Sequence, residues 1–66
     1  MSRPYTINIA DMEAFVTGIV ERVSKCETAY TVGVEQGRFD MVSFMLPRKR
    51  AKEVQDLINK RLYEVL

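Results

Sequence analysis

The sequence predicts an α+β fold, a small two-layer sandwich in which two helices pack on one face of a short β-sheet. Three observations favour this fold. Apolar residues alternate near the N-terminus, they alternate again between residues 28 and 46, and two further segments repeat them at spacings of three and four. The resulting element order is β-α-β-β-α. Because 66 residues have room for one core, residues 1–66 are expected to form a single small α+β domain.

The first strand is expected at residues 4–9, where three apolar side chains share one side: Tyr5, Ile7 and Ile9. A helix is expected to follow, because apolar residues then recur at helical spacing: Met12, Phe15, Val16, Ile19, Val20 and Val23. Asp11 near the start of this helix and Lys25 near its end both suit the helix dipole. The chain is therefore expected to open with a strand that leads into an amphipathic helix.

Residues 28–46 are expected to form a β-hairpin. Gln36-Gly37 marks the tight turn, since glycine supplies the positive φ that hairpin turns need. Pairing Glu35 with Arg38 across this turn gathers apolar side chains on one face: Tyr30, Val32, Val34, Phe39 and Met41. Toward its end the second strand is apolar on both faces. This predicts that the strand is central in the sheet or covered by a partner.

The last helix is expected from about Arg48 to Val65. Pro47 is expected at its first position, where a missing N–H costs nothing. The remaining pattern is an apolar stripe that would pack on the sheet: Ala51, Val54, Leu57, Ile58, Leu62 and Val65. This helix completes the two-helix layer of the predicted sandwich.

The start of the last helix carries four cations, called here the basic turn: Arg48, Lys49, Arg50 and Lys52. Free N–H groups and the helix dipole disfavour cations at this place by about 0.3–1 kcal/mol each at low salt. One interpretation is an anion-attracting patch that binds a phosphate or an acidic protein surface. The other is a solvated helix face whose charges are offset by i,i+4 pairs: Lys49–Glu53 and Lys52–Asp56.

Charge is distributed unevenly along the chain. Net charge is only +1, which argues against a general polyanion binder. Residues 1–36 carry three cations against five anions, and residues 37–66 carry seven cations against four anions. Such asymmetry favours an oriented contact with a partner or with a second copy of the chain.

The sequence has few residues suited to catalysis. It contains no His, the usual general base and metal ligand near neutral pH. Cys26 has no visible base to activate it, and the three glycines are too isolated to form a phosphate loop. We therefore expect no enzymatic activity, no cofactor and no metal site. A single cysteine and the lack of a long apolar run predict a cytoplasmic protein that does not span a membrane.

Two resemblances concern local or topological features. The segment Met41–Pro47, followed by an amphipathic helix, resembles the strand-to-helix junction of ribbon-helix-helix repressors over about 20 residues. In that family the strand pairs across a dimer and enters the DNA major groove. The predicted element order is also similar to that of the DinI-type modulators of RecA, which implies a regulatory module. No site residues follow from either resemblance.

The function expected from these features is that of a small non-enzymatic regulatory or inhibitory protein of the phage or plasmid type. Its expected partner is a protein with an acidic patch, and a homodimer is expected. The expected partner-binding residues are Arg48, Lys49, Arg50, Lys52, Arg38, Phe39, Met41 and Met45. Two alternatives remain open: a dimeric nucleic-acid-binding regulator that contacts phosphates through the basic turn, and a structural subunit of a larger assembly.

Overall fold

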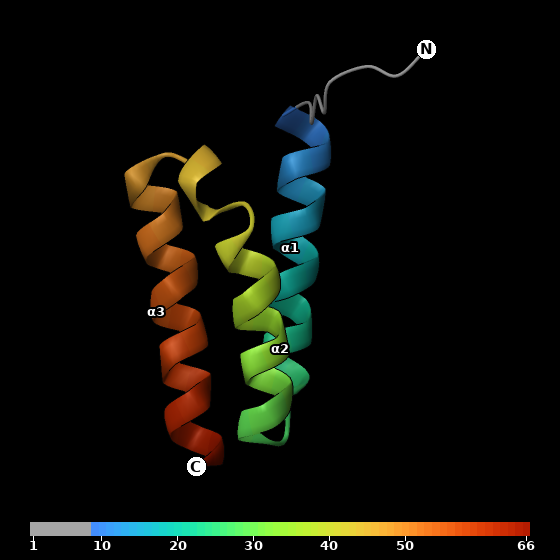
Figure 1. The fold of residues 1–66 in the computed structure, drawn as a ribbon, viewed down its shortest axis with the longest axis vertical. Helices are drawn as coiled ribbons and strands as arrows, with labels where there is room; N and C mark the ends of the chain where they lie inside the picture. Colours follow the sequence, from blue (N-terminus) through green and yellow to red (C-terminus); the bar gives the residue numbers. More distant parts are fainter. Residues whose placement is uncertain (1–8) are drawn as a thin grey trace.

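Three α-helices follow one another in the computed structural model, which describes residues 9–66, with side chains described from Asp11 onward. The elements are α1 (Ile9–Lys25), α2 (Ala29–Asp40), a short 3₁₀ turn η1 (Ser43–Met45) and α3 (Arg48–Val65). Each helix packs against the other two. The chain runs down α1, up α2 and down α3, so the N-terminal ends of α1 and α3 lie at the same end of the bundle (Figure 1).

The predicted α+β sandwich is wrong, because residues 9–66 contain three helices and no strand. The segment expected to form a hairpin is instead α2 together with the connection through η1. Residues 41–47, which resembled the strand of a ribbon-helix-helix repressor, are turn, 3₁₀ helix and loop. The strand expected at residues 4–9 lies outside the described residues except for Ile9, which begins α1.

The hairpin prediction was wrong because the apolar residues of a short segment can fit either the strand period of two or the helix period of 3.6. Val32, Glu35 and Phe39 are spaced by three and four residues, and all three are buried on one side of α2. Tyr30 and Met41, assigned to the same face as Val32 in the hairpin, are instead exposed. Gly37 has no positive φ, so it makes no hairpin turn. Glu35 and Arg38 do form an ion pair at 3.7 Å, but as helical neighbours three residues apart.

A capping box starts α2. The Thr28 side-chain oxygen accepts a hydrogen bond from the Thr31 backbone N–H at 3.1 Å, and the Thr28 backbone N–H donates to the Thr31 hydroxyl at 3.4 Å. These bonds satisfy N–H groups that the first turn of a helix leaves without partners. Threonine at the third position replaces the usual Glu or Gln, and it also favours strands. The sequence signal for this helix start was therefore ambiguous.

The two amphipathic helices predicted from the sequence are present. α3 begins at Arg48 and ends at Val65, as expected, although Pro47 is its N-cap rather than its first helical residue. Leu57, assigned to the apolar stripe of α3, is 43% exposed. The core between the helices is formed by nine buried apolar residues: Met12, Val16, Ile19, Val23, Val32, Phe39, Val42, Val54 and Ile58.

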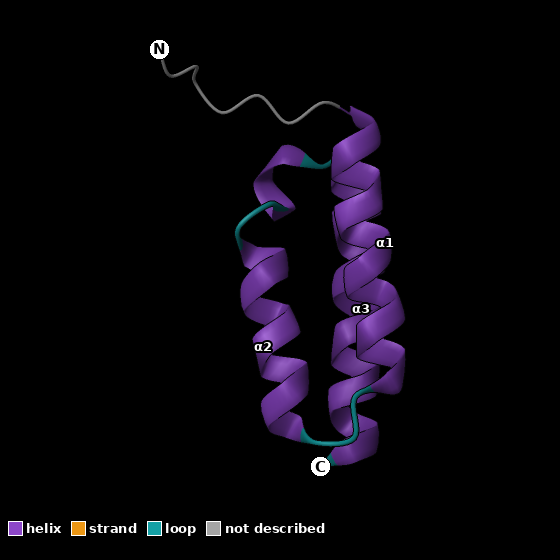
Figure 2. Ribbon diagram, turned by 90° about the vertical axis from the view of Figure 1, so that its right-hand side faces the viewer, coloured by secondary structure: helices purple, strands orange, loops and turns teal. Residues whose placement is uncertain are grey.

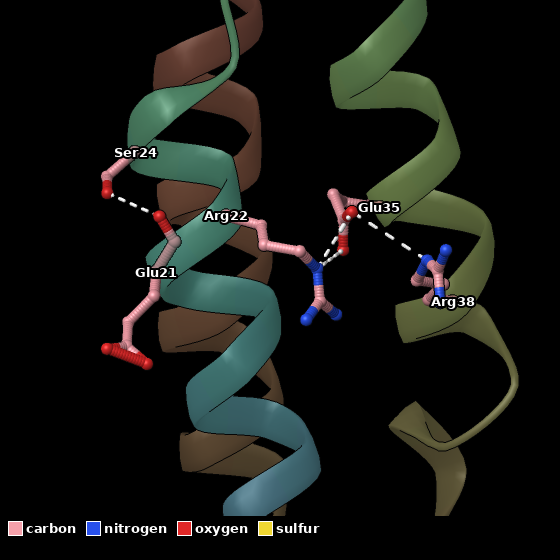
Figure 3. Close-up of polar contacts among 5 residues, drawn as sticks. All are labelled: Glu21, Arg22, Ser24, Glu35 and Arg38. Carbon is pink, nitrogen blue, oxygen red and sulfur yellow. Dashed lines mark hydrogen bonds and ion pairs between the residues drawn. The ribbon is translucent and has the colours of Figure 1, made fainter.

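One charged side chain, Glu35, is buried with the core, only 6% exposed. Arg22 of α1 donates from Nε to both carboxylate oxygens at 3.0 Å, and Arg38 approaches from the next turn of α2 (Figure 3). A buried carboxylate is tolerated when it is paired and hydrogen-bonded. This contact joins α1 to α2.

Polar contacts also join α3 to the other two helices. Gln36 of α2 and Gln55 of α3 exchange side-chain amide hydrogen bonds at 2.6 and 2.9 Å. Near the C-terminal end, Arg61 Nε donates to the Cys26 carbonyl oxygen at 2.8 Å. Within residues 9–66 the helices fall short of the combined length and apolarity needed to cross a lipid bilayer.

Candidate protein-binding surface

An apolar groove lies between the N-terminal turns of α1 and the connection from α2 to α3. Its volume is about 640 Å³. Phe15 stands on α1, and Met41, Phe44 and Met45 belong to the connection. The remaining lining residues are two core side chains and one carboxylate: Met12, Val42 and Asp11.

The groove exists because α2 is shorter than its neighbours. α2 has 12 residues and α1 has 17, so α2 is shorter by about 7 Å at ~1.5 Å per residue. Above the end of α2, the chain continues as a turn and η1 (Figure 2). The first turns of α1 therefore face this irregular connection instead of a helix. The three-residue 3₁₀ turn covers less apolar surface than the missing length of α-helix, a little over one turn, would.

Large apolar side chains around the groove remain exposed to solvent. Phe44 is 79% exposed and Met41 71%, while Phe15 and Met45 are about four-tenths exposed. Burying such a side chain fully is worth about 1.5–3 kcal/mol. Several of them gathered at one groove form the kind of contiguous apolar patch that marks a binding surface.

The basic turn lies beside this groove, because Pro47 alone separates Arg48 from the end of the connection at Leu46. Arg50 pairs with Glu13 of α1 at 3.5 Å and with Glu53 at 3.8 Å. Lys52 pairs with Asp56 at 3.0 Å. These contacts give half of the basic turn an internal role.

The other half of the basic turn has no such role. Arg48 and Lys49 are exposed, and neither forms an ion pair within the part of the chain that the structure describes. The N-cap Pro47 makes no side-chain hydrogen bond to the first turn of α3. Two cations without an ion-pair partner in residues 9–66 therefore lie at a helix end that already attracts anions.

The expected binding residues fall into three groups. The basic turn is described above, and Met41 and Met45 line the groove. Arg38 is on α2 beside Glu35, and Phe39 is 2% exposed in the core and unavailable to a partner. Phe44 also lines the groove, and it lies in the segment from Phe39 to Met45 that was expected to contribute apolar burial. Phe15 lines the groove as well but was not among the expected residues. Phe15 fits the apolar spacing of α1, so the sequence alone would place it in the core. Only the tertiary structure shows that it lies at the edge of the core and lines the groove.

A second hollow is smaller and lies between α1 and α3, at about 190 Å³, with Leu57 and Arg61 among its lining residues. Arg61 there is already engaged by Glu64 at 3.1 Å and by the Cys26 carbonyl oxygen. Cys26 is a free, half-buried thiol. Among the described side chains, no three His, Cys, Asp or Glu residues gather as a metal site would require.

Comparison with known proteins adds no functional information. No protein-family model, curated protein or solved structure matches this chain. The groove and the basic turn are therefore interpreted from their own geometry.

Proposed function

We propose that this chain is a small non-enzymatic regulatory or inhibitory protein that binds another protein through the apolar groove and the basic turn. The observation that carries this proposal is the exposure of four large apolar side chains around one groove: Phe15, Met41, Phe44 and Met45. They lie outside a core that is otherwise closed by nine buried residues. A partner that covers them would remove a large apolar area from water.

The charges beside the groove support an acidic partner. Arg48 and Lys49 oppose the dipole of α3 and lack internal partners among the described residues. Carboxylates on a partner would relieve this unfavourable arrangement and would orient the encounter. Arginine is the better anchor of the two, because its planar guanidinium binds a carboxylate through two hydrogen bonds.

Affinity capture from the cells that produce the protein tests this proposal. Wild type is compared with Phe44→Ser, which removes the most exposed groove side chain, and with Tyr63→Ser, which removes an aromatic ring 84% exposed on α3. We expect Phe44→Ser to lose the captured protein and Tyr63→Ser to retain it. Equal capture by both variants would rule out the groove as the binding surface.

Nucleic-acid binding is the second candidate function, and it is favoured by Arg48 and Lys49, which form no ion pair with any described residue. Phosphates would replace carboxylates as their partners, and binding would weaken steeply as salt is raised. The chain has three Tyr and no Trp, so bound nucleic acid would dominate absorbance at 260 nm. A gel shift at low salt that is lost in Arg48→Glu/Lys49→Glu would support this function over the first.

Self-association is the third candidate, either as a homodimer or as a subunit of a larger assembly. Pairing through a strand edge is not available to residues 9–66. The outer side of α2 offers another route, because Tyr30 is 80% and Val34 39% exposed there. Sedimentation equilibrium over a range of concentrations measures the assembly state. A dimer abolished by Tyr30→Lys would favour this function.

A further inference from the structure

We propose that the groove binds an amphipathic α-helix of the partner, oriented with carboxylates at the end of that helix that faces Arg48 and Lys49. This inference rests on the proposed function and specifies the segment that the partner presents. It follows from the lining of the groove, from the lack of a sheet edge within residues 9–66, and from the cations at the start of α3.

The lining suits apolar side chains better than a polar small molecule. Six of its seven residues are apolar, and Asp11 is the remaining one. Small-molecule sites of comparable volume place several polar groups to fix the orientation of a ligand. Met41 and Met45 are flexible and polarizable, so they adapt to the shape of inserted aliphatic or aromatic side chains. The occupant is therefore expected to contribute a row of apolar side chains.

Backbone hydrogen bonding favours a helix over an extended peptide. An extended segment usually binds by adding a strand to an exposed sheet edge, and residues 9–66 contain no strand. Against an apolar lining, the backbone N–H and C=O groups of such a segment would lack partners. A helix satisfies these groups internally and presents residues i, i+3, i+4 and i+7 on one face.

The cations beside the groove give the bound helix a direction. Arg48 and Lys49 begin α3, and the connection runs between this helix end and the N-terminal end of α1 (Figure 1). Arg50 is paired with Glu13 and Lys52 with Asp56, which leaves Arg48 and Lys49 as the cations of the basic turn without an ion-pair partner among the described residues. Carboxylates are therefore expected at the end of the bound helix that faces Arg48 and Lys49.

Selection from a display library of random peptides of about 16 residues, ~24 Å long as helices, tests this inference with the full chain as bait. We expect enriched peptides to repeat apolar residues at i, i+3 or i+4, and i+7, with Asp or Glu concentrated at one end. The selected peptide is then synthesised and titrated against variants by fluorescence anisotropy. Its affinity is expected to fall as salt is raised.

Three variants separate the groove and the two cations from general effects of charge. Phe44→Ser and Arg48→Glu/Lys49→Glu are each expected to lower the affinity for the selected peptide about tenfold or more, and tenfold corresponds to ~1.4 kcal/mol. Lys25→Glu/Lys60→Glu changes the net charge equally at two other exposed positions and is expected to leave affinity within about twofold. A peptide with Lys in place of its carboxylates is expected to prefer Arg48→Glu/Lys49→Glu over wild type.

Several outcomes overturn the inference. The selection could enrich no peptide, peptides whose apolar residues alternate with a period of two, or neutral or basic helices. The affinity of the selected peptide could also be the same for Phe44→Ser as for wild type. A dimer that requires Phe44 would place a second copy in the groove and would equally exclude the helix. The proposed function is judged separately: Phe44-dependent capture of a cellular protein, without selection of acidic helices, would retain the function and reject this inference.

Discussion

The four residues of the basic turn divide into two that are paired within the bundle and two that are proposed to bind a partner. Arg50 and Lys52 have carboxylate partners at 3.5 and 3.0 Å, so part of the turn contributes to the bundle itself. Arg48 and Lys49 have no such partner among the described residues and face the unsatisfied N–H groups of α3. Because these two cations are unfavourable for folding, reversing them has opposite expected effects on stability and on partner binding.

Arg48→Glu/Lys49→Glu is expected to raise the free energy of unfolding by about 1 kcal/mol at low salt, because anions suit a helix N-terminus. The gain is expected to shrink at high salt as the charges are screened. Urea denaturation at two ionic strengths measures it. Lys25→Glu/Lys60→Glu changes the net charge equally but places an anion at the C-terminal end of α1, so this variant is expected to lose stability at low salt. A loss of stability in Arg48→Glu/Lys49→Glu at low salt would contradict the assignment of Arg48 and Lys49 to the exposed first turn of α3.

Glu35 illustrates the energetics of a buried carboxylate. Arg22→Met removes the side chain whose Nε donates to both oxygens of Glu35, and it is expected to cost about 1–2 kcal/mol. The cost is less than for a fully buried pair because Arg22 is 48% exposed and Arg38 remains nearby. Combining Arg22→Met with Glu35→Met is expected to recover most of this loss, since no buried charge is then left. Chemical denaturation of the four proteins in a double-mutant cycle measures the coupling. Additive effects would indicate that the two side chains do not interact.

At the scale of elements, α2 is the helix that the sequence did not reveal. Its inner side carries Val32, Glu35 and Phe39, while its outer side exposes Tyr30 and two glycines. A helix with a charged residue inside and apolar residues outside has a weak amphipathic pattern. α1 and α3 have longer and cleaner stripes, which explains why the sequence predicted them correctly.

Glycine substitution distinguishes the observed helix from the predicted hairpin. Gly33 and Gly37 are exposed on α2, and a Cβ at either position would meet no atom within 4 Å. Gly33→Ala/Gly37→Ala is therefore expected to stabilise the protein by about 1–2 kcal/mol, at ~1 kcal/mol for each helical glycine. Thermal denaturation followed by circular dichroism at 222 nm measures this, and helical signal should be retained. Destabilisation would favour a turn with positive φ at Gly37.

At the scale of the whole molecule, a short middle helix leaves one end of a three-helix bundle incompletely covered. The connection that follows α2 contributes to both the core and the groove, because Val42 is buried while Phe44 two residues later is exposed to solvent. A domain of this size has roughly 3–10 kcal/mol of stability, at about 0.05–0.15 kcal/mol per residue. The loss of one large core side chain is therefore a large fraction of the total.

Two phenylalanines test this division between core and groove. Phe39→Ala is expected to cost about 3–5 kcal/mol and to leave much of the protein unfolded at 25 °C, because Phe39 is 2% exposed. Phe44→Ala is expected to change stability by less than about 0.5 kcal/mol, because Phe44 is 79% exposed. Urea denaturation compares both with wild type. Similar losses would show that Phe44 also belongs to the core and would remove the basis for the groove.

The sequence by itself determined α1 and α3, because each repeats apolar residues at helical spacing over about three to four turns. It also identified the basic turn and the adaptable Met41 and Met45, since charge and residue type are visible without coordinates. Only the tertiary structure decided that residues 29–40 are helical, that Phe39 is core, and that Phe15 and Phe44 line a groove. The physical reason is that short apolar segments fit either period, and burial depends on the neighbours that folding brings together.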